Sequence, residues 1–388
     1  MPTKMREEGV ANGRREGPIL LSSGYAPPEA FPGPQLAECA ATVLCNQASE
    51  ALQYGDRFGY LPLRELIVEW LQSDNVPASV EEILIVSGAK QNLDMCARAF
   101  CRPGETIVVS EPTYMNGLKL FRTAGATPLP VPSDDLGMNV DALEEILSRL
   151  AAKNDPLPKL IYDIPDFHNP SGGVLPLDRR ARLIEIASRY GIPILEDNPY
   201  RWTRFEGSAS LPLKHFDPEG HVIATGTFAK ILGPGLRLGW VHARKDLLQR
   251  IAAFKAEGGT SPLTQMLAYQ FFREQSSLEQ HLRVITDILH RRRNALLSSL
   301  DRHMGALATW NRPSGGYYVW ARLKQDIDTT LVAQEALAAG VKYYPGAVFF
   351  ASPNPPRNYM RLSYSYENED RIEEGIALLA TVLARHGT

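Results

Sequence analysis

The sequence predicts an α/β protein with a large domain, built on a mostly parallel seven-stranded sheet flanked by helices, and a smaller α+β domain. Two observations support this prediction. Between about residues 83 and 243, short runs rich in β-branched residues alternate with helical patterns, which is typical of a parallel sheet covered by helices on both faces. After about residue 245, long helical patterns and a few short strands replace the alternation, which indicates a second domain.

Seven runs have the length and composition of buried strands, and they cover residues 82–88, 106–110, 126–132, 159–165, 192–197, 221–228 and 236–243. Helical patterns between them cover residues 92–100, 138–151 and 177–190. Later in the chain, helical patterns cover residues 262–302, 329–339 and 367–385, and strands are expected at 315–323 and 358–365. Ligands of such sheets bind beyond the carboxyl ends of the strands, so polar residues there are the first candidates for a site.

The length of 388 residues is sufficient for a large domain and a smaller one. We expect four segments, which are a disordered N-terminal tail at 1–18, an N-terminal segment at 19–50 that packs with the small domain, a large domain at 51–275 and a small C-terminal domain at 276–388.

The composition argues against several kinds of partner. With 41 basic and 44 acidic residues the net charge is −3, which implies neither nucleic acid nor a membrane surface. The basic run at 290–294 is expected to be a solvated helix face. No apolar run approaches the roughly 18 residues of a membrane span, and the polar N-terminus has no apolar core of a secretory signal. The four cysteines lack metal-site spacing, so we expect free thiols, no metal and a cytoplasmic protein.

Four residues at the ends of two predicted strands carry the strongest functional signal. Lys230 follows the sixth strand, and Arg237 comes seven residues later, after a glycine-proline turn. Asp197 ends the fifth strand, and Tyr200 lies three residues further on. A lysine, a carboxylate and an arginine in these places are the groups needed to hold pyridoxal phosphate. The lysine forms a Schiff base, the acid keeps the pyridine nitrogen protonated, and the arginine binds the phosphate.

Four further motifs are weaker when each is taken alone. The segment SGAKQN (87–92) joins a strand to a helix whose N-terminus could bind a phosphate. Tyr114 could stack on a flat ring, and Asn169 could donate to a phenolic oxygen. Arg361 is a planar donor suited to an α-carboxylate. Each motif also has an ordinary structural explanation, namely an α/β connection, a core tyrosine, an Asn-Pro turn and a surface ion pair.

Taken together and in this order, the motifs resemble those of the fold type I pyridoxal-phosphate enzymes, specifically the class I and II aminotransferases. The chain is most similar to the 2-aminoadipate and kynurenine aminotransferase group, which also forms the effector domain of MocR-like regulators. The resemblance extends from about residue 19 to 385. It is carried by YGDRFGYLPLRE (54–65), SGAKQ (87–91), EPTY (111–114), NPSG (169–172), EDNPY (196–200), TFAKILGPGLRLGW (227–240), PSGGYYVW (313–320) and RLSYS (361–365).

The resemblance implies a role for each catalytic residue. Lys230 would carry the cofactor as a Schiff base and then move the proton between the substrate Cα and the cofactor C4′. Asp197 would pair with the ring nitrogen. Asn169 and Tyr200 would bind the phenolic oxygen, and Tyr114 would stack on the ring.

The resemblance also implies the residues that bind the remaining groups. The phosphate would be held by the backbone of Ala89 and Lys90, by Thr227 and Arg237, and by Tyr54 of the other subunit. The substrate would be held by Gly24, Tyr25, Asn169 and Arg361. Because Tyr54 would reach the phosphate of a partner subunit, a homodimer with shared active sites is implied.

Several positions depart from the usual pattern of that group. Ala89 and Lys90 stand where Ser-Gln is common, and Ala229 stands where a serine often precedes the lysine. Both changes remove hydroxyls near the phosphate. The charge of Lys90 could compensate for them, or its side chain could face solvent. Near the substrate, the unusual positions and candidate contacts are Tyr25, His168 and the loop 255–262.

Three functions are compatible with these motifs. The first is an aminotransferase of amino acid metabolism or biosynthesis, which exchanges an amino group between an α-amino acid and a 2-oxo acid. The second keeps the cofactor but performs elimination, cyclisation, decarboxylation or carbon–carbon bond formation at Cα. The third is the effector domain of a transcription regulator, for which residues 1–18 are too short to supply a DNA-binding domain. The sequence does not determine the amino acid substrate.

Overall fold

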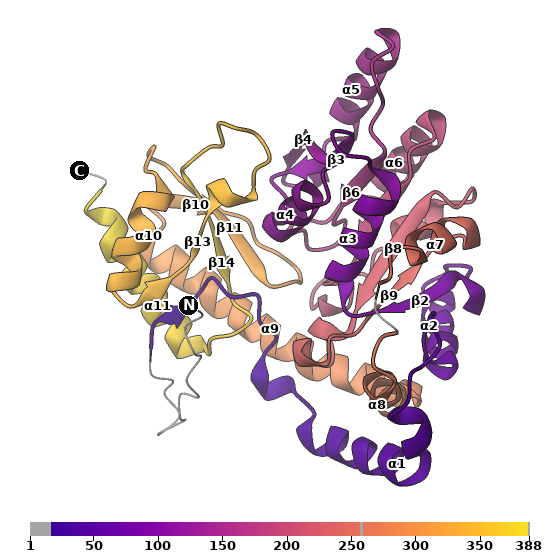
Figure 1. Ribbon diagram of the computed structural model, residues 1–388. Helices are drawn as coiled ribbons and strands as arrows, with labels where there is room; N and C mark the ends of the chain where they lie inside the picture. The colour runs from indigo at the N-terminus through magenta and orange to yellow at the C-terminus, as the bar shows by residue number, and fades with distance from the viewer. Residues whose placement is uncertain (1–16, 257–258, 387–388) are drawn as a thin grey trace.

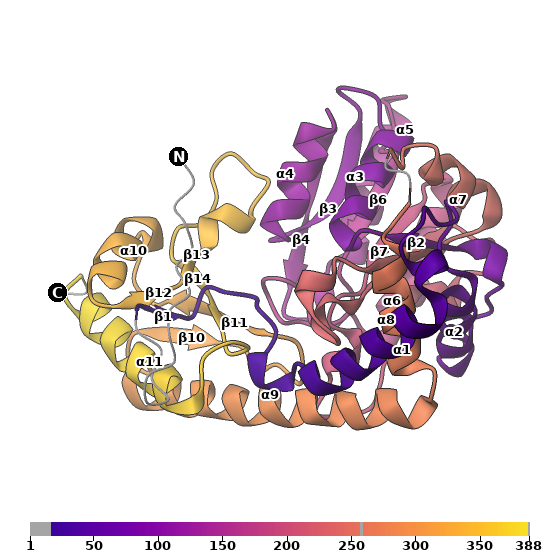
Figure 2. The same cartoon turned by 60° about the horizontal axis from the view of Figure 1, so that its bottom comes forward.

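The computed structural model describes residues 17–256 and 259–386, so the expected tail at 1–18 lies outside the described residues except for its last two. The chain forms a large α/β part and a smaller α+β part, and the long helix α9 (Gln275–His303) runs along both of them (Figure 1, Figure 2). With 29 residues, α9 has a length of about 43 Å. The two parts are therefore joined by a continuous helix as well as by loops.

The large part is built on a mixed sheet. Its strands are β2 (Ile83–Val86), β3 (Thr106–Glu111), β4 (Thr127–Asp134), β5 (Gly137–Met138), β6 (Leu160–Asp163), β7 (Ile194–Asp197), β8 (Val222–Thr227) and β9 (Gly239–His242). They lie in the order β2-β9-β8-β7-β6-β3-β4-β5. Strands β3, β4, β6, β7 and β8 are parallel, whereas β9 is antiparallel to both of its neighbours. The seven predicted strands and the mostly parallel sheet are confirmed, and β5 adds an eighth strand.

The eighth strand occupies the predicted start of a helix. The helical pattern at 138–151 placed the first residue of that helix at Met138, but Met138 belongs to β5, and α5 (Val140–Ala152) begins two residues later. The side chain of Asn139 accepts a hydrogen bond from the Ala142 backbone amide at 3.0 Å. An N-cap of this kind fixes the start of a helix, which explains the difference.

Helices cover both faces of the sheet. One face packs against α3 (Ala89–Phe100), α4 (Met115–Thr123) and α7 (Lys245–Ala252), and the other packs against α5 and α6 (Leu177–Tyr190). Strand β3 illustrates the division, because Ile107 and Val109 join the first cluster while Val108 joins the second. Successive strand side chains point to opposite faces, so a strand buried on both faces is apolar throughout.

The smaller part contains an antiparallel sheet in the order β10-β11-β14-β13. Its elements are β10 (Ala308–Trp310), β11 (Tyr318–Leu323), α10 (Thr329–Ala338), β12 (Val341–Lys342), β13 (Tyr344–Pro345), β14 (Tyr359–Ser363) and α11 (Glu369–Ala384). The predicted strands at 315–323 and 358–365 correspond to β11 and β14. Buried side chains of this sheet, of α9 and of α11 form one apolar cluster.

The N-terminal segment contacts both parts of the molecule. Strand β1 (Ile19–Leu20) pairs in parallel with β12 of the smaller part. Helix α1 (Gly33–Ala51) instead packs against α8 (Pro262–Phe272), and both contribute to a small apolar cluster of Val43, Ala51 and Met266. The domain boundaries at residues 50 and 275 stay predictions.

The basic run 290–294 on α9 differs from its prediction as a solvated face. Arg292 and Arg293 are buried. Arg292 donates to the Ser365 carbonyl at 2.9 Å, and Arg293 donates to the Pro313 carbonyl at 2.8 Å. The prediction was wrong for these two arginines, because packing of α9 against the smaller part turns them inward.

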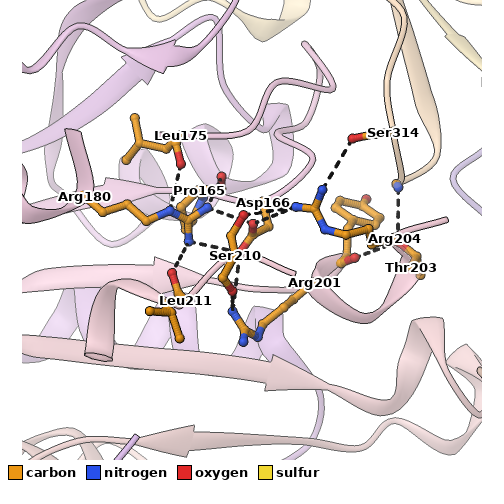
Figure 3. A network of polar contacts seen from close by, with 12 residues as sticks. Pro165, Asp166, Leu175, Arg180, Arg201, Thr203, Arg204, Ser210, Leu211 and Ser314 are labelled. Carbon is orange, nitrogen blue, oxygen red and sulfur yellow. Dashed lines mark hydrogen bonds and ion pairs between the residues drawn. The ribbon is translucent and has the colours of Figure 1, made fainter. Parts of the chain in front are cut away.

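A buried ion pair fixes the loop that follows β6 (Figure 3). The Arg180 guanidinium donates to both oxygens of Asp166, at 2.8 and 3.2 Å. It also donates to the backbone carbonyls of Pro165, Leu175 and Leu211. Both side chains are almost fully buried. Because each guanidinium nitrogen has an acceptor and the charge has a counter-ion, the burial of Arg180 is tolerated.

Two further arginines lie at the outer side of the same carboxylate. Arg201 and Arg204 approach Asp166 at 3.9 and 3.8 Å. The Arg204 guanidinium also lies 3.5 Å from the hydroxyl of Ser314, in the chain segment that leads into β11 (Figure 3). Asp166 therefore has ionic contacts within the large part, and Arg204 connects it to the smaller part.

Replacing Asp166 by asparagine is expected to lower the free energy of unfolding by about 3–5 kcal/mol, because it leaves the buried Arg180 without a counter-ion. Chemical denaturation followed by circular dichroism measures the change. The matched control is Asp301→Asn, which removes an exposed ion pair with Arg312 and is expected to cost less than about 1 kcal/mol. Equal effects of the two substitutions would contradict the role given to Asp166.

Candidate active site

A cavity of about 320 Å³ lies between the two parts of the molecule, beyond the carboxyl ends of the parallel strands. Asp197 is the last residue of β7, and Thr227 is the last residue of β8. Asn169 lies in the loop after β6, and Tyr114 precedes α4. Arg361 comes from β14 of the smaller part. The parallel order of the strands is thus what brings residues distant in sequence to one place.

All residues to which the resemblance assigned a binding or catalytic role line this cavity, with one exception. The lining includes Gly24, Tyr25, Ala89, Lys90, Tyr114, Asn169, Asp197, Tyr200, Thr227, Lys230, Arg237 and Arg361. The exception is Tyr54, whose side chain is 87% exposed on the surface beside Gly55. Its predicted role involves a second subunit and stays a prediction.

Asp197 lines the cavity, and its two carboxylate oxygens have different surroundings. Its Oδ2 accepts a hydrogen bond from the Tyr162 hydroxyl at 2.9 Å. Its Oδ1 is buried and has no hydrogen-bond partner among the described residues. Burial raises the pKa of Asp197 to about 7, although the Tyr162 hydrogen bond and the charge of Lys230 oppose this. A buried, unpartnered carboxylate oxygen is unfavourable, so the site fits a cationic N–H donor such as a pyridinium nitrogen.

The Lys230 ammonium lies in the same cavity, where its Nζ donates to the Gly24 carbonyl at 2.6 Å. The ring of Tyr317 has its centre 4.9 Å from Nζ, and that of Tyr200 lies at 5.7 Å. These contacts hold the amine at the wall of the cavity, between the N-terminal segment and the β8 end.

The surroundings of Lys230 favour its neutral form. Burial, together with the positive charges of Arg361 and Lys90, lowers the pKa of Lys230 to about 7, against the raising effect of Asp197. An amine with a pKa near 7 has a substantial neutral fraction at neutral pH. It can therefore act as a nucleophile toward an aldehyde and as a proton acceptor.

Arg361 is a buried cation with no acidic partner among the described residues. Its guanidinium donates to Asn169 Oδ1 at 2.8 Å and to the Ser22 carbonyl at 2.7 Å. It lies over the ring of Tyr318 at 4.0 Å, and its Nε has no hydrogen-bond partner in the described part of the chain. A guanidinium in this state is suited to a carboxylate ligand.

The opposite end of the cavity has the features of an anion site. Gly88 precedes α3 with φ +89°, and a Cβ there would lie 2.7 Å from Arg237 Nη2, so only glycine fits. No side chain caps this helix. The backbone amides of Ala89 and Lys90, at the start of α3, are therefore available to an anion, whereas the Gln91 amide donates to the Gly88 carbonyl.

Two candidate substrate contacts do not reach the cavity. His168 is buried behind the Asn169 loop, with its ring nitrogens 3.0 Å from the hydroxyls of Ser110 and Ser171. Burial lowers its pKa to about 3, so it is neutral and supports the loop. The hypothesis that His168 contacts the substrate was wrong, because both its nitrogens face neighbouring serines.

The described residues of the loop 255–262 also lie outside the cavity lining. Lys255 Nζ donates to the carbonyls of Arg57 and Ile85 at 2.9 and 2.8 Å. Residues 257–258 lie outside the described residues. The described part of this loop is attached to the backbone of β2 and does not contact the cavity of its own chain.

Three tyrosines at the site were not predicted. Tyr162 orients Asp197, and Tyr344 lines the cavity. Tyr318 accepts a hydrogen bond from the Tyr200 hydroxyl at 3.1 Å, and a Cβ on Gly24 would collide with the Tyr318 hydroxyl. The motif PSGGYYVW contains Tyr318, but nothing in that motif indicates which of its tyrosines faces the cavity.

Within the described residues, no cluster of three or more histidine, cysteine or carboxylate side chains could bind a metal ion. The four cysteines are free thiols there. No described helix combines the length and apolar character that crossing a bilayer requires.

Comparison with known proteins gives consistent matches along the chain. The family description "Aminotransferase class I and II" matches residues 19–378. Aromatic-amino-acid aminotransferase 1 of Thermococcus litoralis is 40% identical over 368 residues, which cover 94% of this chain and 88% of that protein. 2-Aminoadipate transaminase of Thermus thermophilus is 34% identical, with 95% and 91% covered. The structure of kynurenine aminotransferase from Pyrococcus horikoshii, in complex with PMP, has a TM-score of 0.91 at 34% identity, with 96% and 92% covered.

The reactivity of Lys230 should follow a titration near pH 7, because its pKa is lowered to about 7 and only the neutral amine reacts. The rate of reductive trapping of the apoprotein with pyridoxal phosphate and borohydride is expected to rise from pH 6 to 8. In Arg361→Gln the midpoint should move to higher pH, because a nearby positive charge is lost.

The control for this shift is Arg357→Gln, which removes an exposed arginine of the smaller part and should leave the midpoint unchanged. A wild-type midpoint above pH 9, read from mass spectra of the trapped peptide at each pH, would contradict the environment described for Lys230.

Proposed function

We propose that Lys230 is the residue that binds the cofactor covalently. The premise is that this chain belongs to the aminotransferase class I and II family and is a pyridoxal-phosphate-dependent transferase. The chain moves an amino group between an α-amino acid and a 2-oxo acid. The observation that carries the proposal is that Lys230 and Asp197 line the same cavity, and that Asp197 Oδ1 has no hydrogen-bond partner among the described residues. Bound pyridoxal phosphate supplies an electron sink for the bond broken at the substrate Cα.

The residues of the cavity have separate roles in proton transfer and in holding the cofactor ring. With the cofactor bound, Lys230 Nζ would move the proton between the substrate Cα and the cofactor C4′, and its pKa of about 7 supports this role. Asp197 holds the proton on the ring nitrogen, so that the ring stays electron-withdrawing. Tyr200 and Asn169, which line the same cavity, would bind the phenolic oxygen, and Tyr114 would stack on the ring.

Arg361 binds the α-carboxylate of the substrate. Its support is the buried guanidinium with an unpartnered Nε, already oriented by Asn169 and by the ring of Tyr318. The backbone at Gly24 lies beside Lys230 and completes this end of the site. A planar arginine and a side-chain amide would donate hydrogen bonds to the substrate carboxylate from two directions. These contacts would fix the orientation of the substrate Cα–H bond relative to the lysine.

The preferred amino donor has a large uncharged side chain, aromatic or apolar. The four cations that line the cavity, Lys90, Lys230, Arg237 and Arg361, are assigned to the phosphate, the amine chemistry and the α-carboxylate. The remaining wall offers aromatic and apolar surface from Tyr25, Met115, Ile164 and Tyr344. The name of the Thermococcus litoralis relative, an aromatic-amino-acid aminotransferase, supports the same choice. The relatives favour transamination over the other reactions of a Cα carbanion.

A single set of assays tests this function. The wild-type holoenzyme is expected to convert phenylalanine or tyrosine to its 2-oxo acid with a kcat/KM at least about tenfold above that for aspartate, with 2-oxoglutarate and pyruvate tried as acceptors. Lys230→Ala should lose transamination and show no pyridoxyl adduct after borohydride, whereas the exposed control Lys119→Ala should retain both. An adduct that persists on another lysine of Lys230→Ala would refute the assignment.

We further propose a cytoplasmic homodimer in which Tyr54 binds the phosphate held by the partner subunit. Support comes from the exposure of Tyr54 outside the cavity of its own chain and from the exposed apolar side chain of Leu52, which lines the same surface depression. Free thiols and a net charge of −3 are compatible with a cytoplasmic protein.

Tyr54→Phe should weaken pyridoxal phosphate binding several-fold, since one hydrogen bond to the phosphate is lost, without changing the dimer mass in sedimentation. A monomeric wild-type protein at micromolar concentration would rule out the shared site. The control Tyr190→Phe removes a surface hydroxyl that contacts Ser148, far from the cavity lining, and should leave cofactor affinity unchanged.

A further inference from the structure

Two cations at the phosphate end of the cavity lack acidic partners. Lys90 and Arg237 both line the cavity. Arg237 donates to the carbonyls of Ser87 and Pro234 at 3.1 and 3.4 Å, and it has no ion pair with a carboxylate in the described chain. The Lys90 ammonium makes no hydrogen bond or ion pair with the described residues. Two neighbouring cations without a counter-ion repel each other, and an anion between them would remove that repulsion.

Hydroxyl donors are scarce at the same place. Ala89 and Ala229 line the cavity but carry no hydroxyl. The Thr227 hydroxyl already accepts from the Ala229 amide at 3.1 Å and lies 3.4 Å from the Leu238 carbonyl. An anion held here therefore depends on backbone amides and on positive charge more than on side-chain hydroxyls.

We propose that the Lys90 ammonium is a direct ligand of the cofactor phosphate and that, with Arg237, it replaces the missing hydroxyl donors by charge. The inference rests on the pyridoxal phosphate of the proposed function. Lys90 occupies the first turn of α3, so its ammonium acts next to the backbone amides that face the same anion. Two cations and a helix N-terminus together suit a phosphate dianion.

The electrostatic surroundings agree with this arrangement. Burial lowers the pKa of Lys90, and the charge of Arg237 lowers it further. The charge of Lys90 also lowers the pKa of Lys230. The three cations are therefore close enough to influence one another, and a phosphate bound at Lys90 would weaken its effect on Lys230.

The test compares pyridoxal phosphate with pyridoxal, which lacks the phosphate, by titration of the apoenzyme followed by absorbance and protein fluorescence. Lys90→Gln is expected to weaken pyridoxal phosphate binding about tenfold and to leave pyridoxal binding unchanged. Lys90→Arg, which keeps the charge, should bind pyridoxal phosphate nearly as well as the wild type. The exposed lysine Lys119 of α4 provides the matched control, Lys119→Gln, which should change neither affinity.

The outcomes separate the possible failures. Unchanged pyridoxal phosphate affinity in Lys90→Gln would mean that the side chain faces solvent, and would overturn the proposal. An equal loss for both ligands would indicate damage to the cavity as a whole and would overturn it too. If the wild-type apoenzyme bound neither ligand, the cofactor assignment itself would fail and this proposal with it. Selective loss for the phosphorylated ligand, restored by arginine, is the result that supports it.

Discussion

The carboxylate of Asp197 is buried at the end of β7, where one oxygen accepts a hydrogen bond from Tyr162 on the neighbouring strand and the other has no partner among the described residues. Burial disfavours the charged form of this group and raises its pKa to about 7, even though the Tyr162 hydrogen bond and the charge of Lys230 act in the opposite direction. A cationic donor reverses that tendency. Lys230 supplies part of the compensation, and a protonated ring nitrogen supplies the rest. The chemistry of the cavity therefore depends on the Asp197 carboxylate, whose charge the protein alone stabilises only in part.

The cavity as a whole carries an excess of positive charge. Four basic side chains and a single carboxylate line it, and the basic side chains come from both parts of the molecule, with Arg361 on β14 and Lys230, which is partly neutral at neutral pH, after β8. Such an arrangement is unfavourable until anions enter, because like charges in a partly desolvated space repel each other strongly. The cofactor phosphate and the substrate carboxylate are anions of the required kind. Anions that bind in the cavity would therefore lie between cations contributed by both parts of the molecule.

The loop after β6 connects this site with the rest of the fold. Asp166 is held by buried Arg180, and His168 is held between two serines. Asn169 then reaches Arg361. Three of four consecutive residues therefore have fixed polar partners. These contacts hold the loop in place, and with it the Asn169 amide that orients Arg361. In the sequence, His168 had the position of a substrate contact, but its role is to support its neighbour.

The strands, their mostly parallel arrangement, and Lys230, Asp197 and Arg361 as site candidates could be predicted from the sequence. These features leave local signals, since a buried strand is apolar throughout and a polar residue at its carboxyl end interrupts that pattern. The burial of Arg292 and Arg293, the start of α5 at Val140 and the support that Tyr162 gives Asp197 could not be predicted in this way.

What the sequence by itself determined was the set of chemical groups and the strand ends that carry them. Only the tertiary structure decided which groups meet. Arg361 contacts Asn169 across 192 positions of the chain, and Lys230 contacts Gly24 across 206. The physical reason is that such pairs are selected by strand order and by the packing of the smaller part on the larger one, neither of which leaves a periodic trace in the sequence.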